Sequence, residues 1–203
     1  MAHACGERVI VIGPSCSGKS TLGDQLQALT GAPHTELDAL HWEPGWTPAA
    51  PECFRERVRA VTASERWILS GSYIAQQADI SWARADMVVW MDMPFPVVLA
   101  RLITRSWRRA RSKELLWGTN YERFWGQLKL WDTNQSLVAF TVKTFWSRRK
   151  RDYALTQDPR WAHITFVRLR SSRDAATWLR SVERSVQAAG AIVPGETSTA
   201  GPG

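Results

Sequence analysis

The sequence predicts a three-layer α/β fold, in which a parallel sheet lies between layers of helices. Short apolar runs typical of strands alternate along the chain with longer runs of helical periodicity. The first run, residues 8–12, is rich in β-branched side chains, as expected of a parallel strand buried on both faces. It leads into a glycine-rich loop and then a helix, so the chain opens with a βα unit. Ligands of such folds bind beyond the carboxyl ends of the strands, and a site is expected there.

The remaining elements follow from the same patterns. Strands are expected at residues 8–12, 34–37, 67–69, 87–91 and 163–167. One helix face is formed by Leu22, Leu26 and Leu29, and another, with Pro51 near its first turn, by Phe54, Val58 and Val61. Further helices are expected from about residue 96, over residues 137–153, and from Ser172, whose hydroxyl can cap the last helix.

Length and composition indicate one globular domain. The chain has 203 residues, of which 44% are hydrophobic, and this excludes disorder throughout. We expect a single domain over residues 1–189 and a disordered tail over residues 190–203, which are rich in Gly, Ala, Pro and Thr. The chain has no apolar run of about 18 residues and no signal-peptide pattern at its start. The expectation is therefore a cytoplasmic protein without a membrane partner.

The basic residues are concentrated in one quarter of the chain. Residues 101–151 hold 13 of the 26 Lys and Arg residues, against 3 acidic ones, in a chain of net charge +7. Such a block indicates an anionic partner, which is nucleic acid, an acidic surface or the phosphates of a small ligand.

A complete Walker A motif follows the first strand and opens the first helix. It reads Gly13-x-x-x-x-Gly18-Lys19-Ser20. Its glycines allow backbone N–H groups to face phosphate oxygens, and the helix dipole adds positive potential. Lys19 is expected to reach the β- and γ-phosphates, and the Ser20 hydroxyl to bind Mg²⁺. The residues expected to bind ATP are Gly13, Ser15, Cys16, Ser17, Gly18, Lys19, Ser20 and Thr21.

The motif does not say how the phosphate is used, since one fold hosts ATPases, GTPases, switches and kinases. No NKxD motif, which a GTPase would use to read its base, occurs in the sequence. The chain is short for a motor ATPase. Its size and the insert between the second and third strands favour a kinase of a small acceptor.

Four segments, in order, resemble the adenylate-kinase-related P-loop proteins, a nucleoside- and nucleotide-kinase-like family in which many members are labelled DNA topology modulation proteins. The segments are residues 11–22, 37–46, 67–73 and 85–94, and the likeness covers about residues 8–180. It implies the nucleoside-monophosphate-kinase fold with strand order 2-3-1-4-5. It also implies an acceptor-binding insert at residues 39–66 and an arginine-bearing lid at about residues 106–136. Ser70 departs from the family, which usually has an acidic residue there.

Two carboxylates are candidates for the chemistry. Asp38, at the end of the second strand, is expected to hold Mg²⁺ or to accept the proton of an acceptor hydroxyl. A loop-stabilising role is its alternative. Asp92 ends the fourth strand in the same way, but a structural turn explains it equally well because Pro94 follows.

Arginines after the fourth strand are candidates for transition-state stabilisation. Guanidinium groups stabilise a moving phosphoryl group without exchanging a proton. The resemblance favours Arg101 and Arg105, which with Lys19 and Asp38 make up the expected catalytic set. Two or three arginines of the group Arg101, Arg105, Arg108, Arg109 and Arg111 are expected in the site.

Three other features have two interpretations each. Trp42 and Trp46 are suited either to stack on a planar acceptor or to pack the insert. Cys16 is interpreted as a small residue of the loop rather than a nucleophile. The run Arg148-Arg149-Lys150-Arg151 is interpreted as a solvated helix end, with nucleic-acid binding as its alternative.

The prediction is therefore an ATP- and Mg²⁺-dependent phosphotransferase that acts on a nucleotide- or nucleoside-like acceptor. The alternative is a nucleic-acid-associated P-loop ATPase or switch without small-molecule kinase activity.

Overall fold

The computed structural model describes residues 5–112, 115–116, 120–121 and 136–190, and its centre is a parallel sheet of five strands. The strands are β1 (Arg8–Ile12), β2 (His34–Glu36), β5 (Trp67–Ser70), β6 (Met87–Met91) and β9 (Thr165–Leu169). They lie in the order β2-β5-β1-β6-β9, and all four pairings are parallel. Counted along the chain, this is the expected order 2-3-1-4-5.

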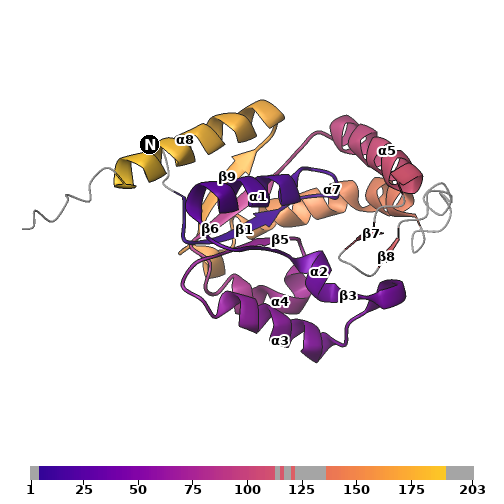
Figure 1. Cartoon of the computed structure of the whole chain (residues 1–203), viewed down its shortest axis with the longest axis horizontal. Helices are drawn as coiled ribbons and strands as arrows, with labels where there is room; N and C mark the ends of the chain where they lie inside the picture. The colour runs from indigo at the N-terminus through magenta and orange to yellow at the C-terminus, as the bar shows by residue number, and fades with distance from the viewer. Residues whose placement is uncertain (1–4, 113–114, 117–119, 122–135, 191–203) are drawn as a thin grey trace, which may run out of the picture.

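Helices cover both faces of the sheet, which confirms the three-layer α/β fold (Figure 1). One face carries α1 (Lys19–Thr30) and α8 (Ser172–Gly190), which pack against each other. The other face carries α3 (Pro51–Thr62) and α4 (Ile74–Ser81), a second packed pair. The long helices α5 (Phe95–Ser112) and α7 (Leu137–Leu155) also contact each other.

Alternation along the central strand produces two cores. Val9 and Val11 of β1 pack with Leu22 and Leu26 on the α1 side. Ile10 and Ile12 belong to the opposite core, with side chains from α3 and with three fully buried tryptophans: Trp67, Trp82 and Trp90. The β-branched run of β1 is therefore apolar throughout because both of its faces are buried.

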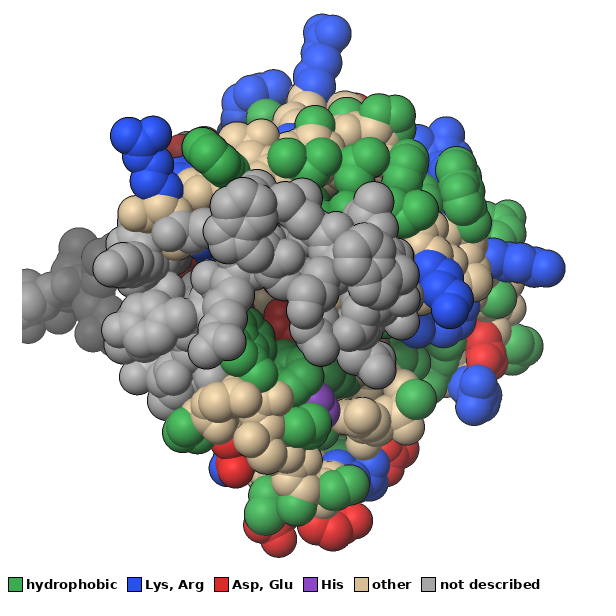
Figure 2. Space-filling view, turned by 90° about the vertical axis from the view of Figure 1, so that its right-hand side faces the viewer, with side chains coloured by type: hydrophobic (Ala, Val, Ile, Leu, Met, Phe, Trp, Pro, Cys, Tyr) green, Lys and Arg blue, Asp and Glu red, His purple; other side chains and the backbone are tan. Residues whose placement is uncertain are grey.

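Small elements complete the site face of the molecule. After β2 the chain forms α2 (Leu37–His41), the strand β3 (Trp42–Glu43), the 3₁₀ turn η1 (Pro44–Trp46) and the strand β4 (Thr47–Pro48). A second hairpin, β7 (Leu115–Leu116) and β8 (Asn120–Tyr121), lies within the expected lid, and β8 contacts η1. Most of the remaining expected lid and nearly all of the expected tail lie outside the described residues. Figure 2 views this face, where a hollow shows hydrophobic, acidic and histidine side chains at its floor.

Several boundaries differ from the expectation. The fifth strand is displaced by two residues, because Ile164 closes a turn onto Trp161 and ladder pairing begins at Thr165. The second strand ends at Glu36, so Asp38 lies in the first turn of α2 rather than at the strand end.

On α3 the expected face of Phe54, Val58 and Val61 packs against the core, and Thr62 is buried beside it. The Thr62 hydroxyl donates to the carbonyl of Val58, which allows a polar side chain to be buried there. No helix in the described part of the chain is long and apolar enough to cross a membrane.

Candidate active site

The phosphate loop connects β1 to α1 and adopts backbone angles that require its glycines. Gly13 has φ 141°, and a Cβ placed there would lie 2.6 Å from the carbonyl oxygen of Met91. Gly18, the N-cap of α1, has φ 101° and no side chain with which to cap the helix. The first N–H groups of α1 are therefore directed to the loop, where an anion can accept from them.

Lys19 lies inside this loop, and its Nζ donates to the carbonyl of Pro14 at 2.9 Å. Burial lowers the pKa of Lys19, the Asp38 carboxylate opposes that shift, and Arg148 and Arg105 add to it. Three cationic side chains and one carboxylate thus act on one another at this loop. Cations gathered at a helix N-terminus form an electropositive site suited to a polyphosphate.

Asp38 is held by an aromatic residue from the next strand end. The Tyr73 hydroxyl donates to Asp38 Oδ1 at 2.5 Å and is also hydrogen-bonded by the Trp42 side chain. Burial and the neighbouring carboxylate raise the pKa of Tyr73 well above its usual range, so the phenol stays a donor. The carboxylate therefore has one fixed partner and a second oxygen directed elsewhere.

The segment after β5 connects the phosphate loop with Asp38. The Gly71 N–H donates to the carbonyl of Val11, and the Ser72 hydroxyl donates to that of Gly13 at 3.4 Å. Since Tyr73 follows immediately, these two bonds place the loop and Asp38 at a fixed separation.

Ser70, the departure from the family pattern, is buried and bonded to His34. Its Oγ lies 2.9 Å from His34 Nε2, and His34 Nδ1 lies 2.8 Å from Asp24. The ring of His34 packs over Gly23, where a Cβ would meet it at 2.3 Å. This chain of contacts ties β5 and β2 to α1, and the serine has a structural role here.

The two arginines favoured after the fourth strand differ in how they interact with the phosphate loop. The guanidinium of Arg101 donates to the carbonyl of Ser17 at 3.2 Å and to the Ser172 hydroxyl at 2.8 Å. Arg105 acts on Lys19 electrostatically, and among the described residues its buried Nε has no hydrogen-bond partner. Arg108 and Arg111 are exposed.

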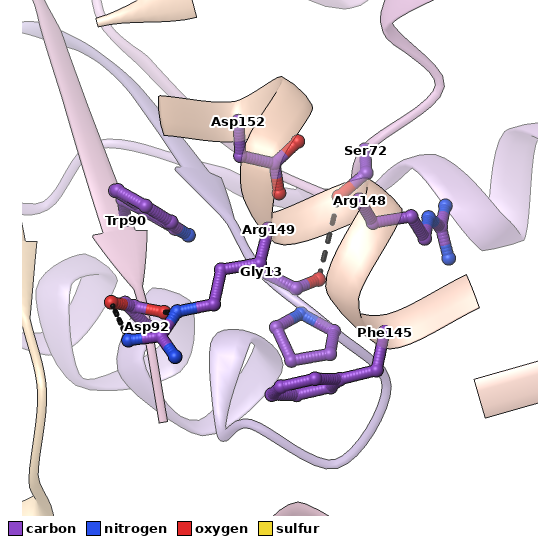
Figure 3. A pocket seen from close by; sticks show the side chains of 9 residues that line it. Gly13, Ser72, Trp90, Asp92, Phe145, Arg148, Arg149 and Asp152 are labelled. Atoms are coloured by element: carbon purple, nitrogen blue, oxygen red, sulfur yellow. Dashed lines mark hydrogen bonds and ion pairs between the residues drawn. The ribbon is translucent and has the colours of Figure 1, made fainter. Parts of the chain in front are cut away.

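The interpretation of residues 148–151 as a solvated helix end is wrong for its first two members. Helix α7 continues to Leu155, and Arg148 and Arg149 lie half-buried on its inner face. Both line a pocket beside the phosphate loop (Figure 3). The pocket is lined by Gly13, Pro14, Ser72, Trp90, Asp92, Phe145, Arg148, Arg149 and Asp152.

Spacing alone carried a signal for this inner face. The buried residues Val138, Thr141, Phe145 and Asp152 recur three, four and seven residues apart, and a stripe with that period passes over positions 148 and 149. Lys150 and Arg151 are exposed, and Arg151 pairs with Asp152 at 2.6 Å.

Of Arg148 and Arg149, Arg148 is the residue whose charge acts on Lys19 and Asp38. Burial and the nearby Arg151 lower its pKa, whereas Asp152, Tyr73 and Asp38 oppose the shift. Arg148 also acts electrostatically on Lys19, and it lines the pocket with Gly13, Pro14 and Ser72.

Asp92 is committed to two ion pairs. Arg149 Nε lies 2.8 Å from its Oδ1, and Arg168 Nη2 lies 2.6 Å from its Oδ2, with the carboxylate almost fully buried. Arg168 also stacks over Trp90, with its Cζ 4.4 Å from the ring centroid. This geometry favours the structural interpretation of Asp92, as a tie between β6, β9 and α7.

The buried carboxylate of Asp152 was missed by the sequence reasoning. Burial raises its pKa, and the hydrogen bond from Arg151, with Arg148 and Lys19, opposes the shift. In the described part of the chain, no three His, Cys, Asp or Glu side chains are grouped as a metal site.

Comparison with known proteins supports the fold. No protein-family model matches the chain, and no curated protein matches it in sequence. The structure of shikimate kinase from Bacteroides thetaiotaomicron aligns with a TM-score of 0.52 at 16% identity, covering 90% of this chain and 99% of that one. A gluconokinase from Sinorhizobium meliloti 1021 aligns with a TM-score of 0.48 at 16% identity, covering 92% and 95%. The alignment with shikimate kinase, together with the sheet order and the phosphate loop, shows that the chain has the fold of the P-loop kinases.

Proposed function

We propose that the protein is an ATP- and Mg²⁺-dependent kinase that transfers the γ-phosphoryl group to a small, nucleotide- or nucleoside-like acceptor. The observation that carries the proposal is the position of Arg148. It lines the pocket with Gly13 of the phosphate loop and with Ser72, the neighbour of Tyr73, which is hydrogen-bonded to Asp38. A donor site, a cation and a carboxylate are the parts that phosphoryl transfer needs.

The loop fits the polyphosphate of ATP. Its glycine backbone angles leave N–H groups exposed to an anion, and the buried Ser17 hydroxyl has no hydrogen-bond partner among the described residues. We assign phosphate contacts to Gly13, Ser15, Cys16, Ser17, Gly18, Lys19, Ser20 and Thr21. Ser20 would hold Mg²⁺ directly and Asp38 through a bound water, which leaves the carboxylate able to accept a proton; the ion when bound would neutralise charge on the phosphates.

The proposed reaction is an in-line transfer. The acceptor hydroxyl oxygen forms a bond to the γ-phosphorus, and the bond from that phosphorus to the β,γ-bridging oxygen breaks. The proton of the hydroxyl passes to the free oxygen of Asp38, and ADP keeps the bridging oxygen. Arg148, with Arg101 and Arg105, stabilises the charge that spreads over the moving group.

The finer resemblance to proteins labelled DNA topology modulation proteins remains a prediction, as does a cytoplasmic location. The nucleic-acid alternative relied on residues 148–151 as a surface cluster. Arg148 and Arg149 line the pocket instead, and Arg151 pairs with Asp152, which leaves Lys150 as the exposed unpaired cation of that run in the described structure.

Removal of the Lys19 ammonium tests the donor site. Lys19→Ala is expected to weaken ATP binding, measured by calorimetry, by about a hundredfold or more, since a charge-assisted contact to phosphate is lost. Lys143→Ala, which removes an exposed lysine on α7, is the matched control and should bind ATP normally. Equal ATP affinity of the two variants would contradict the assignment of the loop.

A further inference from the structure

Aromatic side chains surround the carboxylate proposed to receive the acceptor. The ring of His41 lies 4.5 Å from that of Tyr73 and 4.9 Å from that of Trp42, measured between centroids. The ring of Trp42 lies 5.7 Å from that of Trp46. We call these four residues, His41, Trp42, Trp46 and Tyr73, the aromatic wall.

The wall remains partly open. Fully buried Phe54 packs behind it, against His41 and Tyr73. In contrast, Trp42, His41 and Tyr73 are half-buried, and Trp46 is 38% exposed. A large indole with that exposure presents apolar surface on which a planar ring can stack.

The position of the Trp46 side chain depends on an unusual backbone conformation in η1. Gly45 and Trp46 both adopt left-handed angles, with φ 73° and 60°. A bulky residue at positive φ is strained, and such strain persists only where the surroundings fix it. Strand β8 of the expected lid contacts η1, the turn that contains Trp46. The Trp46 end of the wall therefore lies next to the expected lid.

Three of the four arginines of the insert are committed elsewhere, and the fourth, Arg59, is exposed on α3. Arg55 makes a two-pronged contact with Asp79, and Arg57 binds Glu43 and the carbonyl of Leu40. Arg66 donates to the carbonyl of Thr30 at 2.6 Å. An acceptor phosphate would need such a guanidinium opposite it, and it would also meet the carboxylate of Asp38.

The wall is itself uncharged at neutral pH. Burial lowers the pKa of His41, opposed by Asp38, so the imidazole is neutral. Within the described residues, its buried Nδ1 has no hydrogen-bond partner. The Tyr73 hydroxyl donates its hydrogen bond to Asp38. An uncharged aromatic ring of an acceptor should therefore bind at this surface more tightly than an anionic group would.

From these contacts we infer that the acceptor is a neutral compound with a flat aromatic or heteroaromatic ring, which stacks at the aromatic wall, and a free hydroxyl, which meets Asp38. A nucleoside has this chemistry; a nucleoside monophosphate or an aliphatic hydroxy acid does not. The inference rests on the proposed kinase function and narrows its substrate class.

A matched acceptor panel tests the inference. Nucleosides, their 5′-monophosphates, gluconate and shikimate are each incubated with the protein, ATP and Mg²⁺, and kcat/KM is measured from ADP release. We expect nucleosides to exceed every other class by about tenfold or more, the scale of one base stacked on an aromatic side chain. If gluconate, shikimate or a monophosphate is preferred, the inference fails while the kinase function stands. If no compound is phosphorylated, both fail.

Substitution of the exposed indole gives a second readout. Trp46→Ala should raise the KM for the nucleoside about tenfold and leave the KM for ATP unchanged, and Trp46→Phe should restore most of the loss. Trp107→Ala, which removes a 57% exposed indole on α5, is the control. An unchanged nucleoside KM in Trp46→Ala would overturn the inference.

Discussion

Asp38 and Tyr73 form the contact on which the proposed chemistry depends. One carboxylate oxygen accepts from the phenol at 2.5 Å, and this bond fixes the direction of the other oxygen. The phenol, which is kept protonated by burial and by the carboxylate itself, is a donor over the whole working pH range. Tyr73 is therefore a positioning residue for Asp38.

The first residue-scale prediction concerns the charge of Asp38. Asp38→Asn keeps the shape of the side chain and removes the proton acceptor. Phosphoryl transfer should fall by roughly a hundredfold or more, whereas ATP binding should persist because Lys19 and the loop are untouched. Single-turnover transfer and ATP calorimetry on the same variant measure the two effects. Normal transfer in Asp38→Asn would remove this residue from the mechanism.

The second residue-scale prediction separates Arg148 from its neighbours. Arg148→Ala should lower kcat by about a hundredfold with little change in ATP affinity, because the guanidinium acts on charge that develops during transfer. Lys150→Ala, two residues along the helix and exposed, should retain full kcat. Arg101→Ala and Arg105→Ala are expected to follow Arg148→Ala in direction. Equal kcat values for Arg148→Ala and Lys150→Ala would place Arg148 outside the site.

Helix α7 is the element that brings Arg148 to the loop, and Asp92 holds that helix to the sheet. Its carboxylate joins β6 to Arg149 of α7 and to Arg168 of β9. A buried carboxylate between two guanidinium groups is costly to neutralise, since both cations then lose their partner.

The element-scale stability prediction follows from that tie. Asp92→Asn should lower the free energy of unfolding by about 2 kcal/mol or more, a value reduced from that of a fully buried pair because both arginines are about one-third exposed. Asp158→Asn is the control, since it weakens an ion pair whose Arg160 side chain is 74% exposed. It should cost much less than Asp92→Asn, because solvent screens an exposed pair. Denaturant titrations compare the two, and equal losses would show that Asp92 is not a tie.

A second element-scale prediction uses the aromatic wall. Because burial lowers the pKa of His41, the unfolded chain takes up a proton near the ordinary value of 6.5 before the folded chain does. His41 therefore lowers the free energy of unfolding progressively as pH falls below about 6.5. His41→Phe should flatten the dependence of the free energy of unfolding on pH between about 7 and 5. Parallel curves for the two proteins would contradict the placement of His41.

At the scale of the whole molecule, local patterns predicted the fold well. The strand, phosphate loop and first helix are contiguous in sequence, so the motif and its neighbours predicted β1, Gly18 and α1 directly. The strand order came from the resemblance, and the structure confirms it. The predicted end of the second strand was wrong by one residue. An apolar residue such as Leu37 fits the pattern of a buried strand and that of a buried helix equally well, so the pattern did not show where the strand ends.

The parts of the site that depend on distant contacts were not predictable in this way. Asp92 and Arg168 are 76 residues apart in sequence, and no spacing rule joins them. Arg148 was interpreted from its charged neighbours, although the spacing of the buried residues of α7 indicated an inner face at positions 148 and 149. That spacing does not say which group the inner face meets, and the tertiary structure shows that it lines the pocket beside the phosphate loop.

The fate of the γ-phosphate of ATP tests the central claim most directly. ATP labelled in its γ-phosphate is incubated with the protein, Mg²⁺ and a mixture of nucleosides, nucleotides and hydroxy acids, and in parallel with DNA. A kinase should place the label in an organic phosphate ester, and the mixture should accelerate ATP consumption by about tenfold or more. Label found only in inorganic phosphate, with DNA and not the small molecules accelerating its release, would contradict the account and favour a nucleic-acid-associated ATPase.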